Sequence, residues 1–148
     1  MQVRFGQLMG DTARIWKMHL NILLKPMGLS YAKYSTLLMI DRHSGELMQN
    51  ELANLLSIEH PTLARVLNDL QKNGWIEKKQ HSKDKRVKII FFTKNGKNRF
   101  EKCKQIVNNF RKEILFNVSE KRLKQNIEAL EQIFNNLSNL QEIKCSKK

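Results

Sequence analysis

The chain has 148 residues, enough for one domain with its own core, with or without an added oligomerisation element. It carries 27 lysines and arginines against 14 acidic residues, a net charge of +13 that favours nucleic acid first and an anionic membrane second. A merely soluble basic protein is the alternative on charge alone. No run of 18 apolar residues occurs and the first residues contain no apolar core, so we expect no transmembrane span, no signal peptide and a cytoplasmic location.

The residues that usually carry chemistry form no recognisable group. Cys103 and Cys145 lie 42 positions apart, which predicts neither a disulfide framework nor a metal site, and the four histidines are scattered. There is no glycine-rich phosphate loop, no supported Ser-His-Asp motif and no paired carboxylates in an apolar frame. We therefore expect no enzyme activity, no cofactor and no metal. Cys103 belongs to an apolar stripe, which predicts a buried, inert thiol.

Two helices are predicted at the start of the chain. Apolar residues at helical spacing predict the first over residues 7–24, and Pro26 and Gly28 end it. Ser30 is a good N-cap for a second helix over 31–43. A short extended segment is expected at 46–48.

A helix-turn-helix follows. Residues 49–56 have one apolar helical face, and a break at 57–60 leads to a helix that starts near Pro61 and runs to about Asn73. Thr62 and Arg65 point away from the apolar side of this second helix. They lie in its N-terminal half, the part that meets base edges when such a helix enters a major groove.

The next segment predicts a hairpin. Residues 75–79 and 87–93 read as strands because they are rich in aromatic and β-branched residues, and a charged loop at 81–86 joins them. Residues 60–99 hold 11 basic and 3 acidic residues, so the basic character concentrates here. Helix-turn-helix plus hairpin predicts a winged helix-turn-helix, a mainly α fold with a small β-hairpin wing.

From residue 94 the helical period returns, and Ser119 is the expected N-cap of a last helix. The stripe of this last helix steps by four and three residues, so it can pack in its own domain's core or pair with a partner. Its apolar residues are Leu123, Ile127, Leu130, Phe134 and Leu137.

Three segments together resemble the MarR family of dimeric winged-helix transcription regulators, most closely its SlyA-like members. They are ARIWKMHLNILLKPMGLS at 13–30, QNELANLLSIEHPTLARVLNDLQKNGWIEKK at 49–79 and DKRVKIIFFT at 84–93. The last is similar to the family's Asp-x-Arg wing, with Phe92 in place of a leucine. The resemblance implies an obligate homodimer on a pseudo-palindromic site, with half-sites roughly 34–36 Å apart. It also implies a dimerisation domain made of 1–29 with 94–148 and a DNA-binding domain at 30–93.

Roles in the major groove follow from the resemblance. Arg65 is the expected base reader because arginine can bridge guanine O6 and N7, worth roughly 1–3 kcal/mol of discrimination. Its alternatives are a phosphate contact or a pair with Asp84 or Asp69. Pro61 and Thr62 match groove-facing positions. Further candidates for phosphate are Gln49 and Asn50, at a helix N-terminus, and His60, which alternatively only precedes the proline.

Roles in the wing follow in the same way. Arg86 is expected in the minor groove, where a narrow A·T-rich groove attracts guanidinium. Asp84 is expected to orient it or to pair with a basic neighbour that keeps the loop in shape. Lys83, Lys85 and Lys88 are candidate phosphate contacts, the alternative being a solvated loop.

SlyA-like proteins are often released from DNA by small aromatic carboxylates, so the resemblance also implies an effector pocket. Arg14 and Tyr34 match positions that line it, and Arg14 could hold a carboxylate through two hydrogen bonds. Leu38 and Trp16 are candidate walls, although Leu38 stands where relatives carry a polar group and Trp16 alternatively belongs to the core.

The sequence thus predicts a homodimeric, sequence-specific DNA-binding transcription regulator. Two alternatives remain at this stage. One is a non-specific architectural winged helix that binds DNA or RNA, and the other is a module whose basic face meets acidic proteins.

Overall fold

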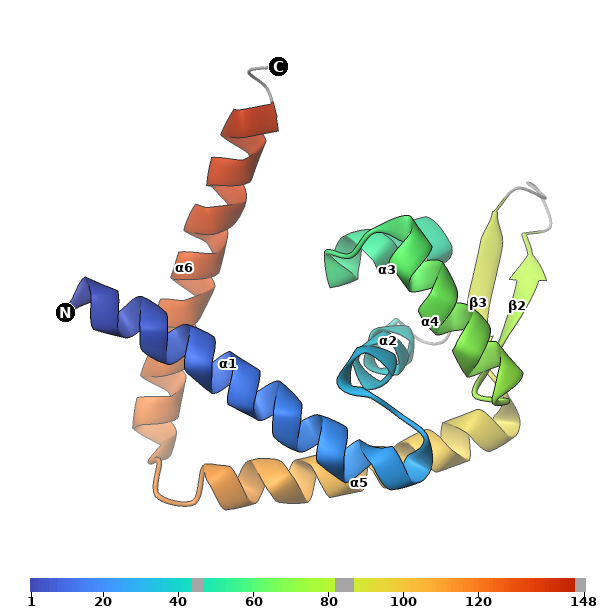
Figure 1. The fold of residues 1–148 in the computed structure, drawn as a ribbon, viewed down its shortest axis with the longest axis horizontal. Helices are drawn as coiled ribbons and strands as arrows, with labels where there is room; N and C mark the ends of the chain where they lie inside the picture. The colour runs from blue at the N-terminus through green and yellow to red at the C-terminus, as the bar shows by residue number, and fades with distance from the viewer. Residues whose placement is uncertain (44–46, 82–86, 146–148) are drawn as a thin grey trace. The chain divides into compact units, whose positions relative to one another are not determined.

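The computed structural model describes residues 1–43, 47–81 and 87–145 (Figure 1) and contains two compact units, residues 1–109 and 110–148. The first unit holds four helices, a three-stranded sheet and most of a fifth helix. The second holds the end of that helix and the last one. None of the helices in the described residues is both long and apolar enough to cross a bilayer.

The first unit begins with α1 (Gln2–Leu24), which starts five residues earlier than predicted. Gly6 and Gly10 interrupt the pattern of good helix formers there, so the sequence signal is weak although the helix forms. The predicted end is confirmed. A 3₁₀ turn, η1 (Lys25–Met27), follows, and Gly28 takes a left-handed conformation at φ 73° that reverses the chain.

The predicted helix-turn-helix is confirmed. Helix α2 (Tyr31–Arg42) starts where Ser30 Oγ accepts a hydrogen bond from the Lys33 backbone N–H at 3.4 Å. Helices α3 (Gln49–Leu56) and α4 (His60–Lys72) are joined by a turn in which Ser57 is left-handed at φ 51°. Three leucines of α4 are buried beneath it: Leu63, Leu67 and Leu70.

The wing is built on an antiparallel sheet of strand order β1-β3-β2. Its strands are β1 (Leu47–Met48), β2 (Ile76–Gln80) and β3 (Lys88–Phe92). Ile76 pairs with Phe92 and Gln80 with Lys88, so side chains alternate between the two faces in a known register. The face with the buried Ile76 and Ile90 also carries Lys78, a polar residue on the inner face.

Helix α5 (Lys94–Ile114) packs closely on the turn that joins α4 to β2. At Gly96 a side chain would overlap the backbone of Trp75, so only glycine fits. Arg99 lies over the Trp75 ring, 3.8 Å from its centroid, and donates to the Asn73 carbonyl at 3.2 Å. The C-terminal end of α4 is therefore held against α5 by a stacked, hydrogen-bonded joint.

A second link joins α2 to α5. The nearly buried carboxylate of Asp41 accepts hydrogen bonds from Lys97 and, at 2.9 Å, from Lys104. Glu101 pairs with the same two lysines, at 2.8 Å from Lys104 and 3.4 Å from Lys97. Burial alone would raise the pKa of Asp41, but the two lysines outweigh it and hold that pKa below its ordinary value.

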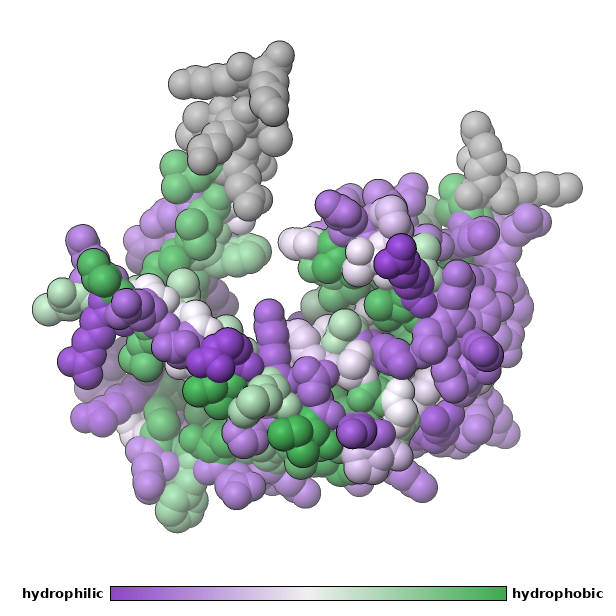
Figure 2. All heavy atoms as spheres, in the orientation of Figure 1, coloured by the Kyte–Doolittle hydropathy of each residue, from purple (hydrophilic) through white to green (hydrophobic). Residues whose placement is uncertain are grey.

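The second unit contains α6 (Glu120–Cys145), and the predicted cap is confirmed because Ser119 Oγ accepts from the Arg122 backbone N–H at 3.4 Å. One side of α6 is apolar and unburied, and it shows as hydrophobic atoms along this helix in Figure 2. The exposed residues are Ile127, Leu130, Phe134, Leu137 and Leu140.

Candidate nucleic-acid interface

The solvent side of α4 carries the predicted DNA-contacting residues. His60, Pro61, Thr62 and Arg65 are all exposed, because the leucines of the same helix turn the opposite side into the core. The side of the unit with α4 and the β2–β3 hairpin is mostly hydrophilic in Figure 2. The arrangement can place hydrogen-bond donors against an anionic, polar surface.

Two lysines hold α4 on its two flanks. On one flank Lys33 of α2 forms an ion pair with Asp69 at 2.6 Å. On the other flank Lys78 of β2 donates to the Asn68 amide oxygen, also at 2.6 Å. The carboxylate of Asp69, one of the alternative partners considered for Arg65, is thus bound to Lys33.

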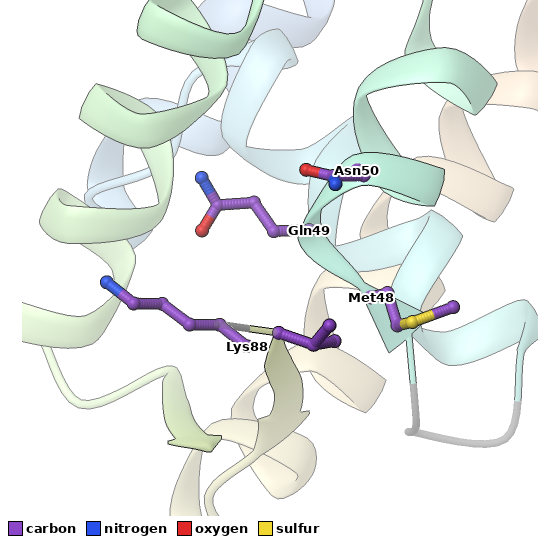
Figure 3. Close-up of a pocket in the computed structure, with 5 residues that line it drawn as sticks. Met48, Gln49, Asn50 and Lys88 are labelled. Atoms are coloured by element: carbon purple, nitrogen blue, oxygen red, sulfur yellow. The ribbon is translucent and has the colours of Figure 1, made fainter. Parts of the chain in front are cut away.

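A pocket of about 280 Å³ opens beside the start of α3 (Figure 3). Gln49 and Asn50 line it from the N-terminus of that helix and Lys88 from the start of β3, so three predicted phosphate-binding residues meet there. Figure 3 shows the Gln49 and Lys88 side chains extending the same way, with Met48 turned to the other side. Val87 also lines the pocket.

The charges around this pocket favour an anion. Among the residues that the structure describes, the lining contains no carboxylate, and the N-terminus of a helix carries partial positive charge. In α3 the carboxylate of Glu51 accepts a hydrogen bond from the Met48 backbone N–H at 3.3 Å. The pocket offers a lysine, two amides and backbone N–H groups to a phosphate oxygen.

Lys78 was not predicted from the sequence as a site residue, and the structure places its ammonium against Asn68 of α4. Burial lowers the pKa of Lys78, and the neighbouring charge of Lys88 lowers it further. The available signal was the two-residue period of the strand, which puts Lys78 on the same side as Ile76. A lysine at that position predicts a polar contact with the helix that covers the sheet.

Part of the predicted wing lies outside the described residues. This applies to Lys83, Asp84, Lys85 and Arg86, so their roles stay predictions.

The predicted effector residues lie in contrasting surroundings. Arg14 is exposed on α1 and donates to Asp11 at 3.0 Å. Tyr34 is buried, with its ring 5.6 Å from that of Phe100. Trp16 and Leu38 are half-buried.

Cys103 is fully buried, as the sequence predicted, and its Sγ donates to Met27 Sδ at 3.2 Å. Burial raises the pKa of this thiol, which disfavours the reactive thiolate. Within 1–43, 47–81 and 87–145, no three His, Cys, Asp or Glu side chains come together as a metal site would need.

Comparison with known proteins decides the family. Residues 27–87 match the MarR family. The transcriptional regulator PA3341 is 32% identical, with a TM-score of 0.82 over 91% of this chain and 98% of that one. The chain belongs to the MarR family. As a MarR-family protein it is a winged-helix transcriptional regulator and not an enzyme.

Two further solved structures are similar to this MarR-family chain. A cysteine-to-serine mutant of MarR from E. coli, complexed with operator DNA, is 25% identical with a TM-score of 0.80, covering 88% of this chain and 94% of that one. A SlyA-like transcription regulator from Listeria monocytogenes is 26% identical with the same TM-score, covering 90% of this chain and 88% of that one.

Proposed function

We propose that this MarR-family regulator binds double-stranded DNA as a homodimer on pseudo-palindromic promoter sites. Helix α4 enters the major groove and the β2–β3 hairpin reaches the flanking minor groove. The observation that carries this proposal is the exposed polar side of α4 beside the pocket lined by Gln49, Asn50 and Lys88. The operator-bound relative supports DNA as the anion that this surface meets.

The residues divide by the part of the duplex they would meet. Arg65 reads a guanine edge, with Pro61 and Thr62 beside it in the groove. His60, Gln49, Asn50 and Lys88 contact phosphate, which positions the protein without reading sequence. The wing residues outside the described part keep the roles expected of them: Arg86 and Asp84 in the minor groove, Lys83 and Lys85 on phosphate.

The homodimer is supported by the unburied apolar side of α6. Ile127 is 47% exposed and Phe134 66% exposed, whereas Leu123 at the start of the stripe is half-buried. Contiguous exposed apolar surface of this kind marks an interaction site, and a second copy would cover it. We assign dimerisation to residues 1–29 with 94–148, and DNA binding to 30–93. This role places the protein with the chromosome, in the cytoplasm.

A small aromatic carboxylate remains the proposed effector, held by Arg14 and Tyr34 with Trp16 and Leu38 as walls. Arg14 would exchange the carboxylate of Asp11 for that of the ligand. The side chains of this pair are 67% and 62% exposed, and exposed ion pairs contribute at most about 1 kcal/mol, so the exchange costs little.

The test is a titration of the intact protein against genomic fragments, including the region upstream of its own gene, at several salt concentrations. Specific fragments should bind at least about 10³-fold more tightly than the rest. Equal affinity for every fragment would support the architectural alternative instead. No duplex binding at physiological salt would support the protein-interaction module.

A further inference from the structure

Asn68 lies on the exposed side of α4, three residues after Arg65, so the two side chains are neighbours on the helix surface. The side-chain amide of Asn68 is held by a residue of the sheet. Lys78 of β2 comes from the inner face of the strand and its ammonium lies 2.6 Å from Asn68 Oδ1. Ten residues separate the two positions in the chain, so the contact depends on the way β2 packs against α4.

The chemistry of the lysine fixes the orientation of the amide. An ammonium has three donors and no acceptor, so the atom that faces Lys78 must be the amide oxygen. The NH₂ group of Asn68 then points away from Lys78. A freely rotating asparagine offers DNA both a donor and an acceptor, whereas this one presents its donors.

That orientation discriminates between the two purines. Asparagine usually reads adenine with both ends of its amide, donating to N7 and accepting from the N6 amino group. When its oxygen is bound by Lys78, the second of these contacts is weakened. Guanine carries acceptors at both N7 and O6, which a donor-only side chain can meet.

We propose that Lys78 is a specificity-determining positioning residue, which holds the Asn68 oxygen and so makes Asn68 select guanine over adenine beside the base read by Arg65. This inference rests on the proposed DNA-binding function and deepens it.

The surroundings of Lys78 keep the contact in place. Asp69, the adjacent carboxylate on α4, is bound by Lys33 on the opposite flank and does not compete for Lys78. Lys78 is half-buried, so its ammonium has lost part of its hydration. The hydrogen bond to the amide oxygen of Asn68 replaces part of that lost hydration. Lys88, on the same face of the hairpin, repels it and offers no alternative acceptor.

The next residue provides a matched control. Lys79 has the same charge and lies on the same strand, but it faces the other way and its ammonium lies 4.6 Å from the centroid of the Phe91 ring. Lys78→Met and Lys79→Met therefore remove one charge each from adjacent positions, and only the first releases Asn68.

The experiment measures affinity for the tightest-binding genomic duplex and for each of its single-base variants, with the full-length protein. Lys78→Met should lower the guanine-over-adenine preference at one position by about tenfold, the size of one good base contact. Lys79→Met should leave that preference unchanged, and Lys78→Arg, which keeps a donor, should retain it. Both methionine variants should lower non-specific affinity by similar amounts. Thermal unfolding confirms that each variant is folded.

A double-mutant cycle tests whether Lys78 acts through Asn68. Asn68→Ala should remove the same preference, and adding Lys78→Met to it should change nothing further. Additive losses would overturn the proposal. The proposal would also be overturned if Lys78→Met weakened binding to all duplexes equally and had a salt slope about one unit smaller than that of Lys79→Met. Lys78 would then be a phosphate contact.

If the unmodified protein prefers no duplex, the proposed function itself fails and this inference with it. A preference that survives Lys78→Met overturns only the inference.

Discussion

Arg65 is the side chain on which the proposed reading of the DNA sequence depends most. It lies on the exposed side of α4, and the acid nearest to it on the next turn, Asp69, is bound to Lys33. An arginine at such a position can form two parallel hydrogen bonds to guanine through its rigid planar guanidinium, a geometry that the ammonium of lysine lacks.

Arg65→Ala should reduce discrimination at one base pair by about 1–3 kcal/mol and leave the preference at the other base pairs unchanged. The measurement is a base-by-base competition assay on the best genomic site. Lys72→Ala is the control, because Lys72 is exposed on the last turn of the same helix and its loss should weaken all duplexes alike. Uniform weakening by Arg65→Ala would show that this residue only clamps phosphate.

Some site residues could be predicted from the sequence and others could not. The difference is whether a pattern within one helix or strand reveals the residue, or only the packing between two elements. The exposure of Thr62 and Arg65 follows from the 3.6-residue period of one helix, which a single sequence carries. The Lys78–Asn68 hydrogen bond depends on packing between α4 and β2, and the Lys33–Asp69 pair on packing between α2 and α4. Local patterns place a residue on a face, but they do not reveal which residue of another element lies opposite.

At the scale of elements, α5 joins the parts of the first unit. It touches the α4–β2 turn through Gly96 and Arg99, and it touches α2 through the lysines that bind Asp41. The sequence predicted where α5 begins, because the helical period returns from residue 94. It could not predict that Gly96 is required for close packing, because glycine in a helix otherwise reads only as a weak helix former.

The Asp41 network predicts a pH-dependent stability. The pKa of Asp41 is lowered in the folded state. The ionised carboxylate therefore stabilises the fold above the ordinary pKa of 3.8, and this stabilisation is lost as pH falls through the lower pKa of the folded state. Asp41→Asn should therefore reduce the free energy of unfolding by about 1–3 kcal/mol at neutral pH, as expected for hydrogen bonds to a charged group. The difference from the unmodified protein should shrink below pH 3.8.

Urea unfolding between pH 7 and pH 3 measures this dependence. Asp11→Asn is the matched control, because it removes an equivalent carboxylate from the exposed Arg14 pair and should change stability by less than about 1 kcal/mol. A stability loss for Asp41→Asn that stays constant across this pH range would contradict the assignment to ionised Asp41.

At the scale of the whole molecule, the sequence divides into a basic middle and apolar ends. The winged part has a compact core, whereas large apolar residues are exposed on α1 and α6. Those of α1 include Val3, Phe5, Leu8, Ile15, Met18 and Ile22. Helical periodicity identifies such stripes, but the same pattern fits a core helix or a partner-binding helix, so the distinction needed the burial that the structure shows.

The proposed homodimer predicts a large effect from one substitution on α6. Phe134 is 66% exposed in the chain, and burying a large apolar side chain contributes about 1.5–3 kcal/mol. A two-fold interface contains the residue twice, so Phe134→Glu should weaken the dimer by about 3–6 kcal/mol, roughly 10²- to 10⁴-fold in its dissociation constant. Asn136→Glu adds the same charge at an exposed polar position nearby and should leave the dimer intact. Sedimentation velocity over a concentration series should show monomers only for Phe134→Glu, and a Phe134→Glu protein still dimeric at the lowest concentration would rule out α6 as the dimer interface.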